Sequence, residues 1–174
     1  MSRRTTAIAA ALSVLALGSP LITGCTNPLA TNFYNSGVEK YEKDDYQGAI
    51  ADWSKAIEIN PKYAYAYINR GIAKYDLKDY HEASADYDKA IEINPQYADA
   101  YNNRGSAKDE LRDYQGAIAD YTKAIEINPQ SAPTYDNRGN ARELVNDLEG
   151  ACRDWRKAAD FGLTQPAEWL KKQC

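Results

Sequence analysis

The sequence predicts an all-α protein, because one pattern recurs along most of the chain with a period of 34 residues. Asn-Pro pairs stand at residues 60–61, 94–95 and 128–129, and small and aromatic residues keep the same step. A repeat of this length holds one pair of helices that cannot bury its apolar face alone, so several units must stack to form a core. We therefore expect an α-solenoid. Its four predicted units are residues 30–63, 64–97, 98–131 and 132–163.

Each unit is predicted to consist of two helices, as the second unit illustrates. Its first helix is expected over 64–77, where small and apolar residues recur at helical spacing. A second helix over 80–93 follows Asp79, whose carboxylate is suited to cap the free backbone N–H groups of the first turn. Asn94-Pro95 ends this helix, because the residue before a proline is pushed out of the α region. The equivalent caps in the other units are Asp45, Asp113 and Asp147.

Small residues recur where the two helices of a unit should approach each other closely. In the second unit these are Gly71 and Ala83, and we expect the aromatic rings of Tyr67 and Tyr87 to fill the space beside them. The repeated glycines are Gly37, Gly71, Gly105 and Gly139, and the aromatic positions are Phe33, Tyr67, Tyr101 and Tyr135 in one row and Trp53, Tyr87, Tyr121 and Trp155 in the other.

An aromatic residue, a glycine, two alanines, a second aromatic residue and a proline at fixed steps resemble the tetratricopeptide repeat (TPR) family. The resemblance covers residues 30–163 and implies a right-handed solenoid whose first helices line a concave surface. Leu163 replaces the proline of the fourth unit, as is expected where no fifth unit follows. The wording of the repeats, including the Asn69-Arg70-Gly71 motif, is similar to versions common in cyanobacteria.

One departure from the family pattern is a row of arginines just before the repeated glycines. We expect each arginine to pair with an aspartate on a second helix, either across its own helix pair or in the preceding unit. The first unit has Ser36 at the arginine position, so its aspartate, Asp52, would pair with Arg70. The alternative is that all of these charges are solvated. The residues are Arg70, Arg104 and Arg138, with Asp86, Asp120 and Asp154.

The first 25 residues read as an export signal followed by a lipid anchor. Arg3 and Arg4 precede an uncharged apolar stretch over 7–17, which is the layout of a secretory signal and is too short to span a membrane. The segment 21–25, Leu-Ile-Thr-Gly-Cys, resembles the bacterial lipobox, in which the cysteine is lipidated and the peptide before it is removed. The resemblance predicts a signal peptide over 1–24, a lipidated Cys25 and a short tether over 25–29. The alternative is ordinary secretion without a lipid.

The carboxy-terminal end is predicted to form a cap over residues 164–174, with Trp169 and Leu170 as its apolar anchors. Gly162 is a suitable stop for the preceding helix. If the cap folds back antiparallel, Cys152 and Cys174 come level with each other, and an exported protein meets an oxidising compartment. A Cys152–Cys174 disulfide is one expectation, and two free thiols are the other.

Composition argues against metal, nucleic-acid and catalytic functions. The chain has one histidine (His81), three cysteines and a formal net charge of −4. Phosphate backbones require a basic face, so nucleic acid is not an expected partner. No glycine-rich phosphate loop or HExxH motif is present, and no nucleophile is placed to use His81, which we interpret as a surface residue. We expect no enzyme activity, no metal and no cofactor other than the covalent lipid at Cys25.

The TPR resemblance places a set of side chains on the concave surface, where partners bind in that family. The amino-terminal half of this set is aromatic and aliphatic, and the carboxy-terminal half is acidic. A partner with an apolar or aromatic segment and a basic segment would match both halves. The alternative is that the tyrosines only fill space between units. The predicted groove residues are Tyr34, Val38, Tyr41, Tyr65, Ile68, Ile72, Tyr75, Asn102, Asp109, Glu110, Asp136, Asn140 and Glu143.

These features together predict an exported protein, lipid-anchored to a bacterial membrane at the periplasmic or outer face. Its expected function is that of an interaction scaffold or assembly adaptor that binds a peptide or helix in the groove. Two alternatives stay open at this point: a self-associating structural spacer of the envelope, and an enzyme whose site is not recognised.

Overall fold

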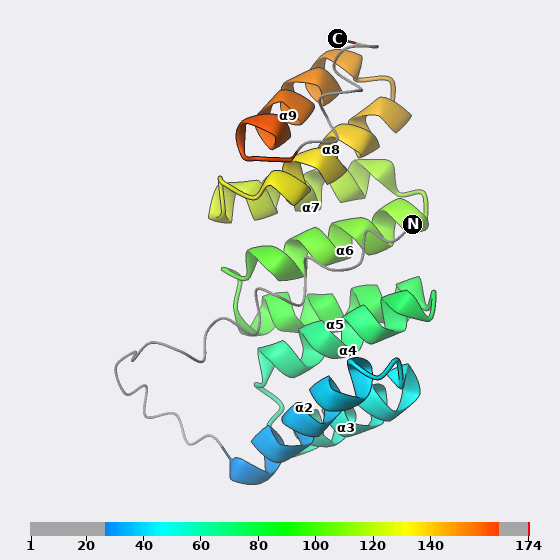
Figure 1. Cartoon of the computed structure of the whole chain (residues 1–174), viewed down its shortest axis with the longest axis vertical. Helices are drawn as coiled ribbons and strands as arrows, with labels where there is room; N and C mark the ends of the chain where they lie inside the picture. Colours follow the sequence, from blue (N-terminus) through cyan, green and yellow to red (C-terminus); the bar gives the residue numbers. More distant parts are fainter. Residues whose placement is uncertain (1–26, 164–173) are drawn as a thin grey trace, which may run out of the picture.

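A computed structural model of the protein describes residues 27–163 and Cys174, and this part of the chain contains eight α-helices and no strand. The helices form four antiparallel pairs joined by short turns (Figure 1). The prediction of an all-α solenoid is confirmed. The predicted signal peptide, Cys25 and the capping helix with Trp169 and Leu170 lie outside the described residues. The helices are α2 (Pro28–Tyr41), α3 (Tyr46–Ile59), α4 (Ala64–Asp76), α5 (Tyr80–Ile93), α6 (Ala98–Glu110), α7 (Tyr114–Ile127), α8 (Ala132–Leu144) and α9 (Leu148–Asp160).

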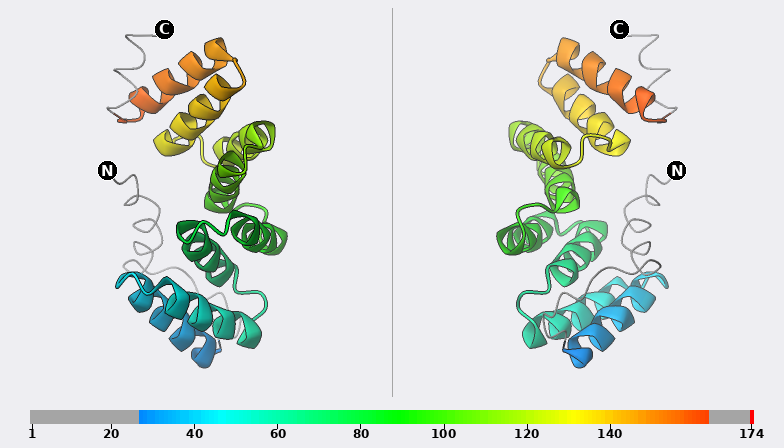
Figure 2. Two further views of the ribbon diagram at one scale, coloured as in Figure 1. Left: turned by 90° about the vertical axis from the view of Figure 1, so that its right-hand side faces the viewer. Right: turned by 90° about the vertical axis from the view of Figure 1, so that its left-hand side faces the viewer.

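The four pairs are stacked in chain order, from α2 and α3 at one end to α8 and α9 at the other, and the stack bends into an arc (Figures 1 and 2). The first helices of successive pairs, α2 with α4, α4 with α6 and α6 with α8, contact one another more than the described second helices do. Elements on the inner side of a bend approach most closely, so the first helices form the concave side. We call the surface formed by α2, α4, α6 and α8 on this side the first-helix surface.

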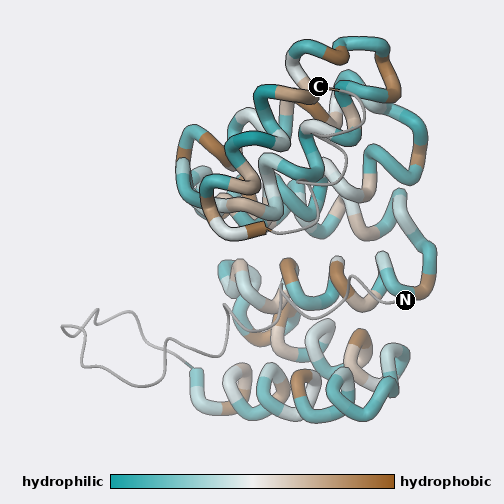
Figure 3. The backbone as a smooth tube through the Cα atoms, turned by 45° about the horizontal axis from the view of Figure 1, so that its top comes forward, coloured by the Kyte–Doolittle hydropathy of each residue, from teal (hydrophilic) through white to brown (hydrophobic). Residues whose placement is uncertain are grey.

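The core is a column of alanines and large rings that runs through all four pairs. The repeated alanines of α3, α5, α7 and α9 are buried, and the largest fully buried side chains are Trp53, Tyr87, Tyr121 and Trp155. Apolar residues recur along every helix of the stack, separated by hydrophilic ones (Figure 3). The first three pairs share their cores with their neighbours, because the rings of Trp53, Tyr87 and Tyr121 each pack partly against the next unit; Tyr87, for example, belongs to one cluster with Ala107 of α6.

The prediction that the repeated glycines make room for aromatic rings is confirmed. A Cβ atom placed on Gly71 would lie 2.6 Å from Cε1 of Tyr87, which is far inside a normal carbon–carbon contact. The same relation joins Gly105 to Tyr121. Only glycine therefore allows the first helix to sit this close to the ring of the second.

The caps of the second helices follow the prediction in three units and depart from it in one. The carboxylate of Asp113 accepts a hydrogen bond of 3.0 Å from the backbone N–H of Gly116, and Asp45 and Asp147 do the same with their own glycines. Asp79 occupies the cap position of α5 but makes no such side-chain bond, so this part of the prediction was wrong. The reason is that Glu82 stands where the other units have a glycine. In the third unit, a Cβ on Gly116 would lie 2.1 Å from the capping carboxylate of Asp113. Glu82 has a Cβ, so Asp79 cannot place its carboxylate in the same way.

The turn between the two helices of each pair contains a left-handed residue that sequence reasoning did not identify. These residues have φ between 60° and 68° and none is a glycine: Asp44, Lys78, Arg112 and Asn146. The left-handed region costs residues with a Cβ roughly 1 kcal/mol, and asparagine tolerates it best. The four turns therefore share a geometry that the residue types at Asp44 and Asn146 favour and those at Lys78 and Arg112 do not.

Candidate functional site

The first-helix surface carries hydrogen bonds that join each unit to the next. Asn69 on α4 donates to the hydroxyl of Tyr34 on α2 at 3.0 Å, and Asn137 on α8 donates to Oδ1 of Asn102 on α6 at 3.2 Å. Tyr75 donates to Oε1 of Glu110 at 3.2 Å. Tyr41 donates to the carboxylate of Asp76. Each bond spans 35 residues and so joins successive first helices, and the bond between Tyr75 and Glu110 brings two predicted groove residues together.

The predicted groove tyrosines are half-buried, with one exception. Tyr34 stacks on Tyr63 with ring centroids 4.9 Å apart, and Tyr75 meets Tyr80 at 5.2 Å. Burial raises the pKa of both Tyr34 and Tyr75. Contacts with the next unit come from Asn69, which bonds the Tyr34 hydroxyl, and from Ala107, which shares a core cluster with Tyr75, so both rings also fill space between units as the alternative interpretation expected.

Tyr41 lies against Tyr46 and Trp53 at the amino-terminal end of this surface, with ring centroids 5.3 and 5.9 Å away. Tyr65 is the more accessible ring: it is 40% exposed and tilts against Tyr97 with centroids 5.1 Å apart. Burial, and next the neighbouring Tyr97, raise the pKa of Tyr65 to about 12, so it stays a neutral hydrogen-bonding group at physiological pH.

The aliphatic residues of the predicted groove lie deeper than expected. Ile68 is only 5% exposed and packs with Ala64, Ala90 and Ala100 in the core, so its placement on a ligand-accessible surface was wrong. Its neighbours are alanines, and the isoleucine fills the volume that they leave. Val38 and Ile72 are half-buried and pack against core clusters.

The carboxy-terminal half of the first-helix surface is acidic, as predicted. Asp109 and Glu110 are adjacent at the end of α6. One carboxylate oxygen of Asp109 accepts a hydrogen bond of 3.3 Å from the hydroxyl of Tyr121, and the other is buried without a hydrogen-bond partner among the described residues. Burial of the carboxylate raises the pKa of Asp109 to about 6; the negative charge of Glu110 adds to the rise and the Tyr121 hydroxyl opposes it.

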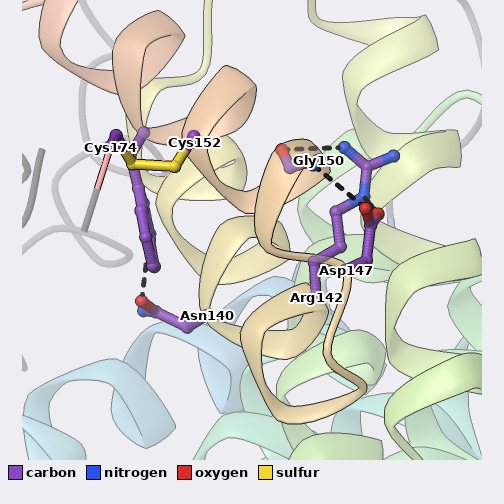
Figure 4. The surroundings of a disulfide bond; sticks show 7 residues. Asn140, Arg142, Asp147, Gly150, Cys152 and Cys174 are labelled. Carbon is purple, nitrogen blue, oxygen red and sulfur yellow. Dashed lines mark hydrogen bonds and ion pairs between the residues drawn. A yellow bond between two sulfur atoms is a disulfide. The ribbon is translucent and has the colours of Figure 1, made fainter.

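The last first-helix, α8, contributes Asp136, Asn140 and Glu143. Asn140 donates to Asp136 at 3.4 Å and accepts a hydrogen bond of 3.2 Å from Nε1 of Trp155 (Figure 4). The side chain of Asn140 is therefore held by the fold on both sides. Glu143 is half-buried and lies one turn further along the helix.

A ladder of buried ion pairs runs through the units, which confirms the predicted pairing across each helix pair. Arg70 holds both carboxylate oxygens of Asp86 at 2.9 and 2.6 Å, and the same fork joins Arg104 to Asp120 and Arg138 to Asp154. The aspartates are only 3–4% exposed, so the alternative of solvated charges is wrong. Bidentate pairs of this kind fix orientation as well as charge.

The third nitrogen of each arginine reaches back to the preceding unit. Nη1 of Arg70 donates to Ser54 at 3.0 Å, Arg104 to Asp88 at 2.6 Å, and Arg138 to Thr122 at 3.1 Å. The predicted pair of Asp52 with Arg70 does not form. Ser36 donates to Asp52 at 2.6 Å and Lys40 binds it at 2.6 Å, which satisfies this carboxylate within its own unit.

Sequence reasoning missed a second cation on each aspartate. Lys74 lies 2.9 Å from Asp86, Lys108 lies 2.8 Å from Asp120, and Arg142 lies 2.8 Å from Asp154. With Lys40, these cations recur at 34-residue steps, which is a signal that the sequence contains. Arg142 also points to the backbone oxygen of Gly150 and to Asp147 (Figure 4).

The two carboxy-terminal cysteines, Cys152 and Cys174, form a disulfide in the structure, with Cα atoms 5.8 Å apart (Figure 4). Cys152 lies near the start of α9 and is buried. The bond closes a loop of 22 residues, and a loop of this size stabilises a protein by roughly 3 kcal/mol through the entropy of the unfolded chain.

Two features sought in the described part of the chain were not found. No group of three or more histidine, cysteine or acidic residues there is arranged to hold a metal ion. None of the described helices combines the length and the apolar character that crossing a bilayer requires.

The chain belongs to the tetratricopeptide repeat family. A model of this repeat matches residues 64–97 and 98–131, which are also the predicted second and third units, and a second TPR repeat model matches residues 37–78. Together the matches cover residues 37–131, more than half of the chain. None of the curated proteins compared with the chain matches it.

Several solved structures have the same fold. MamA is 26% identical and superimposes with a TM-score of 0.73, over 78% of this chain and 80% of that one. The TPR domain of Arabidopsis OM64 is 26% identical with a TM-score of 0.66, over 67% of this chain and 97% of that one. The first TPR domain of Spaghetti (RPAP3), solved with an HSP90 peptide, is 24% identical with a TM-score of 0.68, over 68% of this chain and 94% of that one. TPR repeats are protein-interaction modules, and the described structure provides the solenoid that such modules use.

Proposed function

We propose that this protein is a lipid-anchored scaffold that binds an extended or helical segment of another protein along the first-helix surface. The observation that carries the proposal is the asymmetry of this surface. Its amino-terminal half presents Tyr34, Tyr41 and the exposed Tyr65, and its carboxy-terminal half presents Asp109 and Glu110. An arc built from rigid helices can offer both halves to one partner at the same time.

The chemistry of the two halves defines the partner. Tyrosines held by their neighbours bury large area on binding at a small cost in side-chain entropy. Glu110 is exposed beside the half-buried Asp109, so an ammonium or guanidinium group can approach these two carboxylates from solution. We therefore expect an aromatic or apolar segment followed by, or preceded by, a Lys/Arg-rich segment.

A related domain shows that this type of fold can hold a short peptide. The Spaghetti (RPAP3) domain is bound to the HSP90 peptide SRMEEVD, which contains three acidic residues. On the present chain, the carboxy-terminal half of the first-helix surface is itself acidic and would repel such a sequence. A partner of opposite charge to that peptide fits this surface better.

Membrane attachment is part of the proposal and rests on the sequence. Cys25 would carry the lipid, and only Thr26 and Asn27 separate it from Pro28, the first residue of α2. A link of this length spans at most roughly 10 Å. The amino-terminal end of the solenoid would then lie close to a bacterial membrane, and the partner would be a component of that membrane or of the adjacent envelope.

The groove is tested with an array of peptides that combine aromatic and basic segments. The tightest peptide is then measured by isothermal titration with the purified protein and with an Asp109→Asn/Glu110→Gln variant. We expect the variant to weaken binding at least tenfold, while a Glu58→Gln/Glu92→Gln variant, which removes two exposed charges from the second helices, changes it less than twofold. Equal loss in both variants would show that the peptide senses net charge and not this surface.

Lipidation is tested separately, by expressing the full chain in bacteria with a radiolabelled fatty acid. We expect label and membrane fractionation for the natural sequence and neither for Cys25→Ser. A Cys174→Ser variant controls for loss of a cysteine, and it should retain the label. A natural chain that is exported without label would overturn the anchor and leave the peptide test unaffected.

A further inference from the structure

We propose that the last helix pair binds an acidic polypeptide segment on a basic patch that is separate from the first-helix surface. The patch consists of Arg138, Arg142, Arg153, Arg156 and Lys157. These residues line one pocket of about 580 Å³ between α8 and α9, together with Tyr135, Asp154 and Asp160. Five cations stand against two carboxylates, which leaves a net charge of +3 in a chain whose overall charge is −4.

The positive charge of the patch is an addition of the fourth unit and not a property of the repeat. At the position of Arg153 the earlier units have alanines, and at the position of Arg156 they have serine, aspartate and threonine. In the second unit the equivalent charges cancel: Arg70, Lys74 and Lys89 stand against Asp86, Asp88 and Glu92. The equivalent residues are Ala51, Ala85 and Ala119 for Arg153, and Ser54, Asp88 and Thr122 for Arg156.

Arg156 occupies a position with a defined role elsewhere in the stack. In the earlier units this position accepts a hydrogen bond from the arginine of the next unit, as Asp88 does from Arg104 at 2.6 Å. Arg156 cannot accept such a bond, and no ion pair joins it to another residue between 27 and 163. It is exposed, so its guanidinium can take a carboxylate from outside the chain.

The other cations of the patch divide into two buried or half-buried arginines and two exposed cations at the edge. Arg138 and Arg142 are both bound to Asp154 at 2.7–2.8 Å, which holds their guanidinium groups in place. Within residues 27–163, Arg153 pairs with Glu149 one turn earlier, and Lys157 lies 3.7 Å from Asp160, both on the exposed side of α9. Exposed pairs of this kind contribute little and can be exchanged for a ligand.

The patch and the groove face different directions. On α8 the patch uses Tyr135, Arg138 and Arg142, whereas the predicted groove uses Asp136, Asn140 and Glu143. Each set follows a spacing of three to four residues, and the two stripes are about a third of a turn apart. One partner in the groove therefore does not occlude a second partner, or a second segment, on the patch.

An acidic polypeptide fits the patch better than a nucleic acid or a membrane does. The positive charge is greatest on the last helix pair, because the equivalent positions carry a net charge of +1 in the third unit and none in the second. A long polyanion would extend from the patch over surface that carries little positive charge, but a run of a few Glu or Asp residues would not. The patch also lies at the end of the stack opposite to residue 27, away from the proposed lipid anchor.

The proposal is tested by fluorescence anisotropy with a labelled peptide of eight glutamates separated by glycines, at low ionic strength. We expect Arg153→Ala/Arg156→Ala to raise the Kd at least tenfold. Lys43→Ala/Lys62→Ala, which removes two exposed charges from the first unit, should change it less than twofold. Circular dichroism checks that both variants are folded, and an unchanged Kd for the arginine variant would overturn the proposal.

Two further measurements separate this site from the proposed groove and from other anions. The Asp109→Asn/Glu110→Gln variant should bind the acidic peptide as the natural chain does, whatever the outcome of the groove test. Vesicles that contain phosphatidylglycerol and a 20-base-pair DNA duplex serve as competing probes. Tighter binding of either probe, lost in Arg153→Ala/Arg156→Ala, would overturn the assignment to an acidic polypeptide.

Discussion

Arg104 grips both carboxylate oxygens of Asp120 from the facing helix of its unit, at 2.8 Å from Nε and 2.5 Å from Nη2, and its third nitrogen holds Asp88 of the preceding unit at 2.6 Å. One side chain thus joins three helices. The hydrogen bond to Asp120 raises the pKa of Arg104, burial of the guanidinium lowers it, and the nearby Asp88 raises it further. The net effect is a raised pKa. The Arg104 guanidinium therefore stays charged, and its bonds hold neighbouring units together.

Removal of Asp120 should therefore be costly. Asp120→Ala leaves Arg104 without its main partner, and the loss of one member of a buried pair destabilises a protein by roughly 3–5 kcal/mol. Lys108 loses the same carboxylate, which lies 2.8 Å from its ammonium group. The free energy of unfolding is measured by denaturation with urea.

Asp88→Ala is the matched control, because it removes another carboxylate from the same arginine at a site whose side chain is 58% exposed. We expect it to cost about 1 kcal/mol or less. Equal effects of the two substitutions would show that burial of the pair does not determine its contribution.

A methyl group on Gly71 should also destabilise the protein. Gly71→Ala places a Cβ 2.6 Å from a ring that is buried on all sides, so the helices must separate. Overpacking of this kind costs roughly 1–3 kcal/mol. Thermal unfolding measures the loss.

A double variant isolates the cause. In Gly71→Ala/Tyr87→Leu the shorter side chain leaves space for the methyl group, so the added cost of the alanine should be smaller than in the natural background. An alanine that costs the same in both backgrounds would rule out the clash as its origin.

The helix-pair architecture was predictable because the same pattern of small and aromatic residues occurs in all four units. Each copy of Gly71 and Tyr87 supports the same packing, and errors at one unit do not propagate to the next. The ion pairs within a unit were predictable for the same reason, since Arg104 and Asp120 keep a constant separation of 16 residues.

The failures occur where a single unit departs from its copies. Glu82 removes the side-chain cap at Asp79, and Ser36 with Lys40 takes the role that was assigned to Arg70. Ile68 illustrates another limit. Its position on the helix lies at the border between the core and the first-helix surface. The small size of Ala64 leaves room for Ile68 to pack into the core. Such choices depend on the volumes of neighbours from different helices.

Replacement of a left-handed residue should stabilise the chain. Lys78 has φ of 68°, which glycine adopts without a steric cost. Lys78→Gly should raise the free energy of unfolding by up to about 0.5 kcal/mol, after the greater freedom of glycine in the unfolded chain is subtracted from a gain of about 1 kcal/mol. Asn146→Gly is the control and should give a smaller gain, because asparagine already tolerates this region. Destabilisation by Lys78→Gly would contradict the prediction.

The buried carboxylate of Asp109 should make stability depend on pH in an unusual direction. Its pKa is raised from 3.8 to about 6 by burial, and next by the charge of Glu110 against the opposing Tyr121 hydroxyl. Between these two values the folded chain holds a proton that the unfolded chain has released. This group therefore favours the folded state below pH 4, and its contribution is lost as the pH rises to about 6.

Asp109→Asn removes this titration and keeps the shape of the side chain. We expect the variant to be more stable than the natural chain by about 1–2 kcal/mol at pH 7.5, after a reduction for partial exposure, and by much less at pH 4. The difference between the two chains cancels every other group that titrates in this range, because all of those groups are shared. Urea denaturation at pH 4 and pH 7.5 measures the difference in unfolding free energy between the two chains. A difference that is the same at both pH values would show that the carboxylate is solvated and not buried.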